Sequence, residues 1–289
     1  MGNLADVLKA VVELLTNPID IDLLAKQYVA AIRSMVEINA MNLNINYFEF
    51  SDVIYTRLIG LSRNVVLPIG YVILAYLMVV ELYNLFSKTE GLTGAGAIQM
   101  PLRIVTKIVI FKFIIDRSHD VLNAIFKLVL HIQNQTFAFA YVHNIPDAVI
   151  EDFKTKAGSM RFFEKIALFL EVNCISLLSF ISMAIVLIVS VSRIFEIYIY
   201  LFIAPIPLAT LPGSEISQMG KSFLKNFTAI CLQGVILALI LFLYTQVAGV
   251  LIVGGTLKEQ FLKGLSAIAI LTVCLFKSAN WAKSICGAM

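Results

Sequence analysis

Residues 166–190 read IALFLEVNCISLLSFISMAIVLIVS, and Glu171 is the one charged side chain in this run. A helix needs about 20 mostly apolar residues to cross the hydrocarbon core of a bilayer, and this run is longer than that. Of the 289 residues, 60% are hydrophobic and 14% charged, whereas soluble domains are about 45–50% apolar and about 25% charged. This composition excludes a soluble globular protein and a disordered chain. It predicts an all-α polytopic integral membrane protein.

Other apolar runs supply further spans. Three meet the length test and one is slightly shorter: residues 64–86, 194–211, 227–253 and 265–281. Residues 101–142 are ambiguous, because a polar break at 116–120 divides them and their first half carries Arg103, Lys107 and Lys112. We interpret them as two more spans, which gives seven; as a pair of interfacial or re-entrant helices they would leave five. The prediction is about 5–7 transmembrane helices.

The distribution of basic residues predicts an orientation, because lysine and arginine gather on the cytoplasmic side of membrane spans. In the seven-span scheme ten lie on one side and four in the short turns on the other. The amino terminus is then outside and the carboxy terminus inside, and the five-span scheme gives the same result. This scheme places Arg193 at an outer turn, one helical turn from Glu196. The ten inner residues are Lys88, Arg103, Lys154, Lys156, Arg161, Lys165, Lys221, Lys225, Lys277 and Lys283.

Residues 1–63 differ from the rest, because they hold seven of the 19 acidic residues. Leu4, Val7, Leu8 and Val11 recur at helical spacing, which predicts an amphipathic helix on a membrane surface or against another subunit. The chain is therefore expected to have two parts: a non-spanning amino-terminal segment over 1–63 and a transmembrane helical domain over 64–289.

The sequence has no pattern typical of catalysis. A glycine-rich segment resembles a phosphate-binding loop, but six residues separate Gly213 and Gly220 where that loop has four. His119, His131 and His143 are twelve residues apart, too far for two ligands on one helical face. No nucleophile has a base at a recognisable spacing. We expect a protein that is not an enzyme and that uses no metal or cofactor.

One polar stripe within residues 101–142 is a candidate conduit lining. Its members are three or four residues apart and so share one face of a helix. Ionisable groups in membrane helices usually face a bundle interior or a water-filled path. The alternative is that the stripe faces neighbouring helices or lipid headgroups. The stripe consists of Asp120, Asn123, Lys127, His131 and Asn134.

A proline-rich segment, APIPLATLPG over residues 204–213, interrupts the apolar run 194–211. Pro205, Pro207 and Pro212 lack an amide donor and clash with preceding carbonyl groups, so a regular helix cannot continue through them. Carbonyl groups freed at membrane depth are tolerated where they are buried in protein or face water. The segment up to Gly213 therefore predicts a broken helix at a subunit interface or a pore.

These residues together resemble a known family. The pattern is similar to the core of TrbL/VirB-type polytopic subunits of type IV secretion systems, in particular those of Gram-positive integrative conjugative elements. The resemblance extends over about residues 60–289, and 1–63 carry no matching motif. It rests on Arg193, residues 198–201, residues 204–209, residues 220–227, Gln233 and Gly234.

The resemblance implies a non-enzymatic channel component of the bacterial cytoplasmic membrane. Such a subunit acts in a homo-oligomer with other secretion subunits and cytoplasmic ATPases, and translocated DNA and relaxase pass through the channel. Basic residues could then contact DNA phosphates on the cytoplasmic side, or else anchor the chain to anionic lipid. The main rival is a small-solute transporter with a discontinuous helix. The candidate contacts are Lys154, Lys156, Arg161, Lys165, Lys221 and Lys225.

Overall fold

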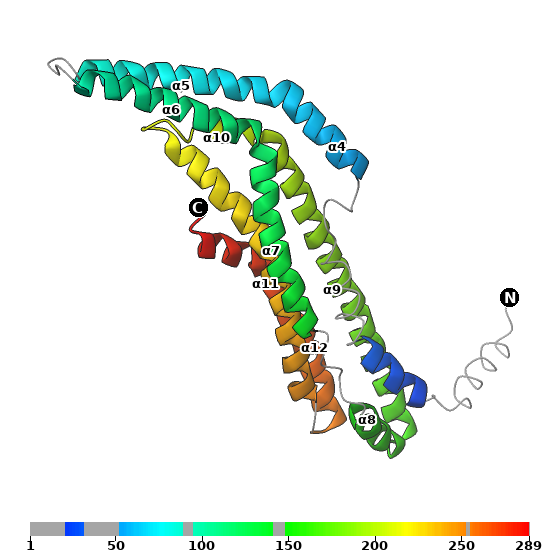
Figure 1. Ribbon diagram of the computed structural model, residues 1–289. Helices are drawn as coiled ribbons and strands as arrows, with labels where there is room; N and C mark the ends of the chain where they lie inside the picture. Colours follow the sequence, from blue (N-terminus) through cyan, green and yellow to red (C-terminus); the bar gives the residue numbers. More distant parts are fainter. Residues whose placement is uncertain (1–20, 32–51, 89–94, 141–147, 253–254, 289) are drawn as a thin grey trace, which may run out of the picture. The chain divides into compact units, whose positions relative to one another are not determined.

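The computed structural model describes residues 21–31, 52–88, 95–140, 148–252 and 255–288. Every regular element in these ranges is a helix, which confirms the all-α prediction (Figure 1). After an unlabelled helix over 21–31, the elements are α4 (Asp52–Leu61), the π-helical turn η1 (Ser62–Val66), α5 (Leu67–Lys88), α6 (Ala95–Asp116), α7 (Ser118–Ala140), α8 (Ala148–Gly158), α9 (Phe162–Ile203), α10 (Pro205–Ala209), α11 (Ser217–Ile252) and α12 (Leu257–Cys286).

Four stretches in the described residues are long and apolar enough to cross a membrane: Asp52–Asn84, Phe163–Ile203, Ser217–Tyr244 and Leu257–Cys286. These four candidate spans in the described residues fit a polytopic membrane protein, and the expected count of five to seven stays a prediction. Residues 101–142 contribute none of the four. They form most of α6 and all of α7, and these helices meet at Arg117, where the polar break predicts a division.

The span expected at 166–190 and residues 194–203 of the span expected at 194–211 belong to one helix, α9, which has 42 residues. At 1.5 Å per residue it is about 63 Å long, twice the ~30 Å hydrocarbon core of a bilayer. The expected turn at Arg193 is wrong, because no glycine or proline interrupts the sequence between Phe162 and Ile203. The apolar sequence is long enough for two spans, but its backbone forms one continuous helix through Arg193.

The expected orientation, with the amino terminus outside and the carboxy terminus inside, stays a prediction. The division expected between 63 and 64 falls inside the candidate span Asp52–Asn84 and stays a prediction. Residues 1–20 and 32–51 of the expected amino-terminal segment lie outside the described residues.

The chain divides into two compact units, each built from three separate segments. The first comprises residues 1–39, 141–185 and 241–273. Within it the helix over 21–31 packs on α8 and α12: the Tyr28 ring stacks on Phe153 at 5.3 Å between centroids, and its hydroxyl donates to the Gln260 carbonyl at 3.2 Å. A 3.1 Å hydrogen bond between Ser182 and Thr272 joins α9 to α12.

The second unit comprises residues 40–140, 186–240 and 274–289. One apolar core in it forms where α7, α9 and α11 meet, around Phe126, Leu201 and Phe227. A smaller core lies between α5 and α6. The short helix α10 contributes Leu208 to the first core and Ala209 to the second, so it joins them.

Candidate functional site

The structure interrupts the helix at the prolines. Helix α9 ends at Ile203, α10 occupies the next five residues after Ala204, and α11 begins only at Ser217. Pro205 lies at the first position of α10, where a missing amide donor costs no hydrogen bond. Pro205, Pro207, Pro212 and Gly213 are all buried in the second unit.

Helix α10 is held closely between two glycines. A Cβ added to Gly70 of α5 would lie 2.9 Å from the Pro205 carbonyl oxygen. One added to Gly220 of α11 would lie 2.6 Å from the Pro207 carbonyl oxygen and 2.7 Å from the Leu211 side chain. The two carbonyl oxygens are backbone atoms, which cannot move as a flexible side chain can. The broken segment is therefore fixed by close backbone packing on both sides.

A buried hydrogen-bond chain caps the end of α9. The Ser62 hydroxyl donates to the Phe202 carbonyl at 2.6 Å, and His119 Nε2 lies 3.1 Å from Ser62 Oγ. Since the hydroxyl has a single hydrogen and gives it to the carbonyl, Nε2 must carry the hydrogen that Ser62 accepts. Ser118 Oγ lies 3.5 Å from His119 Nδ1. The π-helical turn and the α6–α7 junction thus satisfy a carbonyl group at the broken helix.

The protonation of His119 should affect stability. Burial lowers the pKa of His119 and the nearby Arg63 cation lowers it further, while Asp120 acts in the opposite direction. The folded state then binds fewer protons than the unfolded state. The stability contributed by neutral His119 is therefore fully present above about pH 6.5 and falls as the pH drops below that value.

We expect the melting temperature in detergent to decrease between about pH 7.5 and about pH 5.5. His119→Gln, which keeps a donor for Ser62 but cannot titrate, should flatten this dependence. His131→Gln, on the exposed side of α7, serves as the control. An unchanged pH profile in His119→Gln would mean that other groups cause the loss of stability.

Arg193 is buried in the second unit, although its position between apolar runs suggested an outer turn. Its Nη1 donates to Gln133 Oε1 of α7 at 3.4 Å. A Cβ at Gly234 of α11 would overlap both the guanidinium group of Arg193 and the side-chain oxygen Oε1 of Gln133. Three helices therefore enclose a charged group, and the glycine leaves the space for it. Glu196, the partner expected from the sequence, is exposed.

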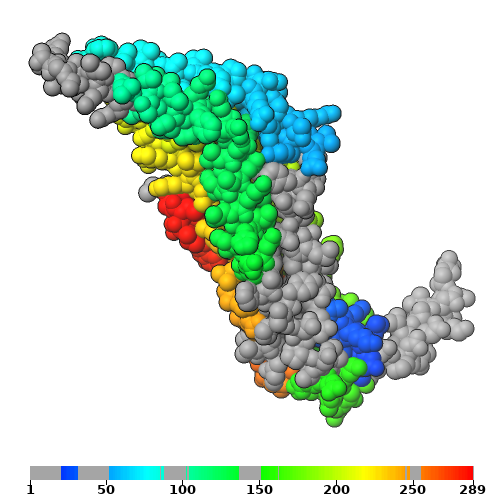
Figure 2. All heavy atoms as spheres, in the orientation of Figure 1, coloured from blue at the N-terminus to red at the C-terminus, as the bar shows by residue number. Residues whose placement is uncertain are grey.

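The polar stripe lies on the outer side of α7. Leu122, Phe126 and Val129 face the core, whereas all of the stripe except Asn123 is exposed. Asn123 is half-buried and donates to the Tyr55 hydroxyl at 2.7 Å. Figure 2 shows one side of α7, in green, that no other segment covers. Within one chain the stripe therefore encloses no path. Its exposed members are Asp120, Lys127, His131 and Asn134.

Two of the basic residues considered for DNA are engaged in ion pairs. Lys154 Nζ lies 2.8 Å from Asp22 Oδ1, and Lys156 Nζ lies 2.5 Å from Asp152 Oδ2. The hydrogen bonds from these lysines hold the pKa of each aspartate below its ordinary value. A phosphate would have to compete with these carboxylates for the two cations.

The other four basic candidates lie two in each unit. Arg161 is exposed and Lys165 half-buried, both in the first unit, and Lys221 and Lys225 are exposed on α11 in the second. The structure therefore does not bring the six basic residues together within one unit.

The sequence alone did not indicate Ser62, Gln133, Gly70 or Tyr55. Their partners are between 57 and 140 residues away in sequence, so no local spacing marks them. One signal was available: Gly234 belongs to the pattern on which the family resemblance rests. As for chemistry, no group of three or more potential metal ligands gathers in the described residues.

Comparison with known proteins identifies the family. The family described as TrbL/VirB6 plasmid conjugal transfer like protein matches residues 32–205. No curated protein and no solved structure matches the chain. The match begins within 1–63, where the sequence showed no motif, and ends at Pro205, so residues 220–227 of the resemblance lie outside it. Because it covers more than half of the sequence, the chain belongs to the TrbL/VirB6 plasmid conjugal transfer-like family.

Proposed function

We propose that the chain is a non-enzymatic channel or scaffold component of a type IV secretion apparatus for conjugative DNA transfer, of the Gram-positive kind. It acts in the bacterial cytoplasmic membrane as a homo-oligomer, together with other secretion subunits and ATPases. Membership of the family supports its place in a conjugal transfer apparatus. The observation that carries the channel role is the exposed polar stripe of α7 on the second unit.

A polar stripe on the outside of a membrane protein needs a polar neighbour wherever it meets the bilayer. Next to lipid, His131 and Asn134 would be costly, because polar groups lose their hydration there. Copies of the chain arranged around an axis would turn these stripes toward a common water-filled path. The same arrangement would cover apolar surface of the second unit, since Ile188, Phe195 and Ile199 of α9 are exposed in the single chain.

In this proposal the short helix α10 is a rigid part of the channel subunit. Leu208 and Ala209 lie in the two cores of the second unit, so a change in α10 would act on both. The basic residues have a smaller part in the proposal, because Lys154 and Lys156 already pair with carboxylates. Contact with DNA phosphates would fall to Arg161, Lys165, Lys221 and Lys225.

Replacing Pro205 and Pro207 together by alanine tests the mechanism. Alanine restores two amide donors, which can bond to the carbonyl groups of Leu201 and Ile203 and extend α9. We expect normal insertion in the membrane, while conjugal transfer from donor cells falls to the level of a strain that lacks the chain.

The matched control is Pro68→Ala, which changes an exposed proline of α5 and should transfer normally. Normal transfer by the double variant would remove the broken helix from the mechanism. If the strain without the chain still transfers DNA, the proposed function itself is wrong. Loss of uptake of a small solute in that strain, with intact transfer, would favour the transporter.

A further inference from the structure

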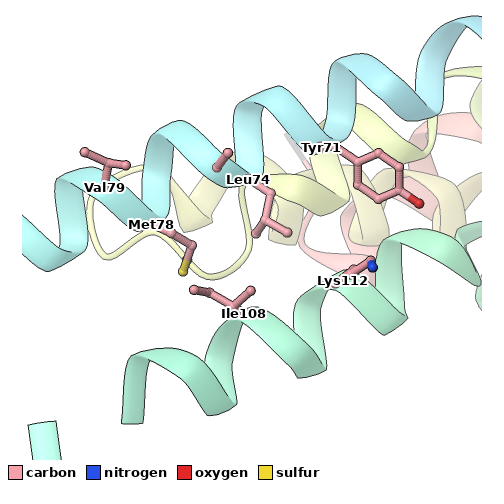
Figure 3. Close-up of a pocket in the computed structure, with 7 residues that line it drawn as sticks. Tyr71, Leu74, Met78, Val79, Ile108 and Lys112 are labelled. Atoms are coloured by element: carbon pink, nitrogen blue, oxygen red, sulfur yellow. The ribbon is translucent and has the colours of Figure 1, made fainter. Parts of the chain in front are cut away.

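An apolar groove lies between α5 and α6 in the second unit (Figure 3). Its volume is about 620 Å³, within the range of about 300–1,000 Å³ of sites that hold small ligands. Leu74 and Met78 of α5 are buried at its floor, with Ile108 of α6 opposite them. The exposed side chains of Ala75 and Val79 line its open side.

One end of this groove is polar. Figure 3 shows Tyr71 and Lys112 at that end and Val79 at the other. The Tyr71 hydroxyl donates to the Asp116 carboxylate, so this carboxylate already has a partner. Lys107, five residues before Lys112 on α6, pairs with Glu81 at 3.0 Å. Lys112 is exposed and does not take part in the ion pairs of the described residues.

The surroundings of the groove decide which ligand fits. Helix α5 belongs to the candidate span Asp52–Asn84, and the side chains beside the groove, Val72, Tyr76 and Val109, are more than 60% exposed. Water forms no hydrogen bonds with these apolar side chains, whereas an acyl chain packs against them and keeps their surface out of water. The lysine at one end offers a positive charge to an anionic group.

We propose that the α5–α6 groove binds an anionic phospholipid, with one acyl chain along Leu74, Met78 and Ile108 and the headgroup phosphate at Lys112. A zwitterionic lipid fits less well, because its own cation neutralises the phosphate. The bound lipid braces the hairpin that holds α10, since Leu74 and Met78 share a core with Ala209. The proposal needs the chain to be in a membrane but does not depend on DNA transfer.

Lipid binding to the full-length protein in detergent tests this site. Native mass spectrometry would follow titration with phosphatidylglycerol and, separately, with phosphatidylcholine of the same acyl chains. Lys112→Gln should weaken phosphatidylglycerol binding about fivefold, as expected for one lysine at a headgroup, and leave phosphatidylcholine binding unchanged. Lys277→Gln, an exposed lysine of α12, is the matched control and should bind like the wild type.

A second pair of variants tests the groove without changing charge. Ala75→Phe fills the groove and should reduce phosphatidylglycerol binding at least as much as Lys112→Gln. Val72→Phe adds a similar ring on the exposed side of α5 outside the groove and should have no effect. Wild-type binding by both Lys112→Gln and Ala75→Phe would overturn the proposal. So would efficient disulfide cross-linking of Ala75→Cys between copies in lipid, which would assign the groove to a second chain.

Discussion

Gly220→Ala is expected to lower the free energy of unfolding by up to about 3 kcal/mol, because the added methyl group meets the Pro207 carbonyl oxygen at 2.6 Å. A backbone oxygen inside a packed core can move only if α10 or α11 moves with it. Gly70→Ala, with its closest approach of 2.9 Å to the Pro205 carbonyl oxygen, should have a smaller effect in the same direction. Thermal unfolding in detergent, followed by the fluorescence of Trp281, measures both.

The control is a glycine with open space around it. A Cβ at Gly60 of α4 would meet nothing within 4 Å, and the residue has helical backbone. Gly60→Ala should therefore stabilise the protein slightly, by about 0.4–1 kcal/mol, through the reduced freedom of the unfolded chain. If Gly220→Ala melts like Gly60→Ala, the close packing around α10 is not present in the protein.

Two substitutions of the buried Arg193 should distinguish its contribution to the stability of the protein from its contribution to conjugal transfer. Arg193→Ala leaves a cavity beside Gln133 and should cost about 2–5 kcal/mol, as large-to-small changes in cores do. Arg193→Met fills most of that space without a charge, and apolar replacements of buried charges are often neutral for stability. We expect the methionine variant to insert and melt much as the wild type does. Its conjugal transfer should nevertheless fall to that of a strain lacking the chain, because ionisable groups inside membrane proteins are usually functional.

The measurement compares membrane level, melting temperature and transfer frequency for both variants. Arg57→Met, which removes an exposed arginine of α4, is the matched control and should transfer normally. Wild-type transfer by Arg193→Met would show that the guanidinium group only fills space. A methionine variant that fails to accumulate in the membrane would show that the charge is needed for folding.

The proline segment was the part of the fold most open to prediction. Pro205 and Pro207 act through their own backbone, so their effect on a helix needs no knowledge of neighbours. The division between α6 and α7 was equally local, because polar residues gather around Arg117. The helical spacing of the stripe also follows from sequence, although its exposure depends on Leu122, Phe126 and Val129 finding a core.

Arg193 shows why the rest could not be predicted. A charge between two apolar runs is typical of a turn at a membrane surface, and only distant residues decide otherwise. Gln133 lies 60 residues away, and Gly234 is on another helix. The same limit applies to Gly70 and Gly220, because the space that a glycine leaves becomes meaningful only when an opposing backbone fills it.

The π-helical turn at Ser62–Val66 contains one extra residue, and this residue sets how far α4 is rotated about the helix axis relative to α5. In this turn the Leu67 amide bonds to the Ser62 carbonyl, five residues back, in place of the four of an α-helix. Since each residue of an α-helix turns the chain by about 100°, losing one residue here would rotate everything before it by that amount. Ser62 would then no longer face Phe202. Family members that lack the extra residue would need another donor for this carbonyl group, so alignments through this span should allow a one-residue gap.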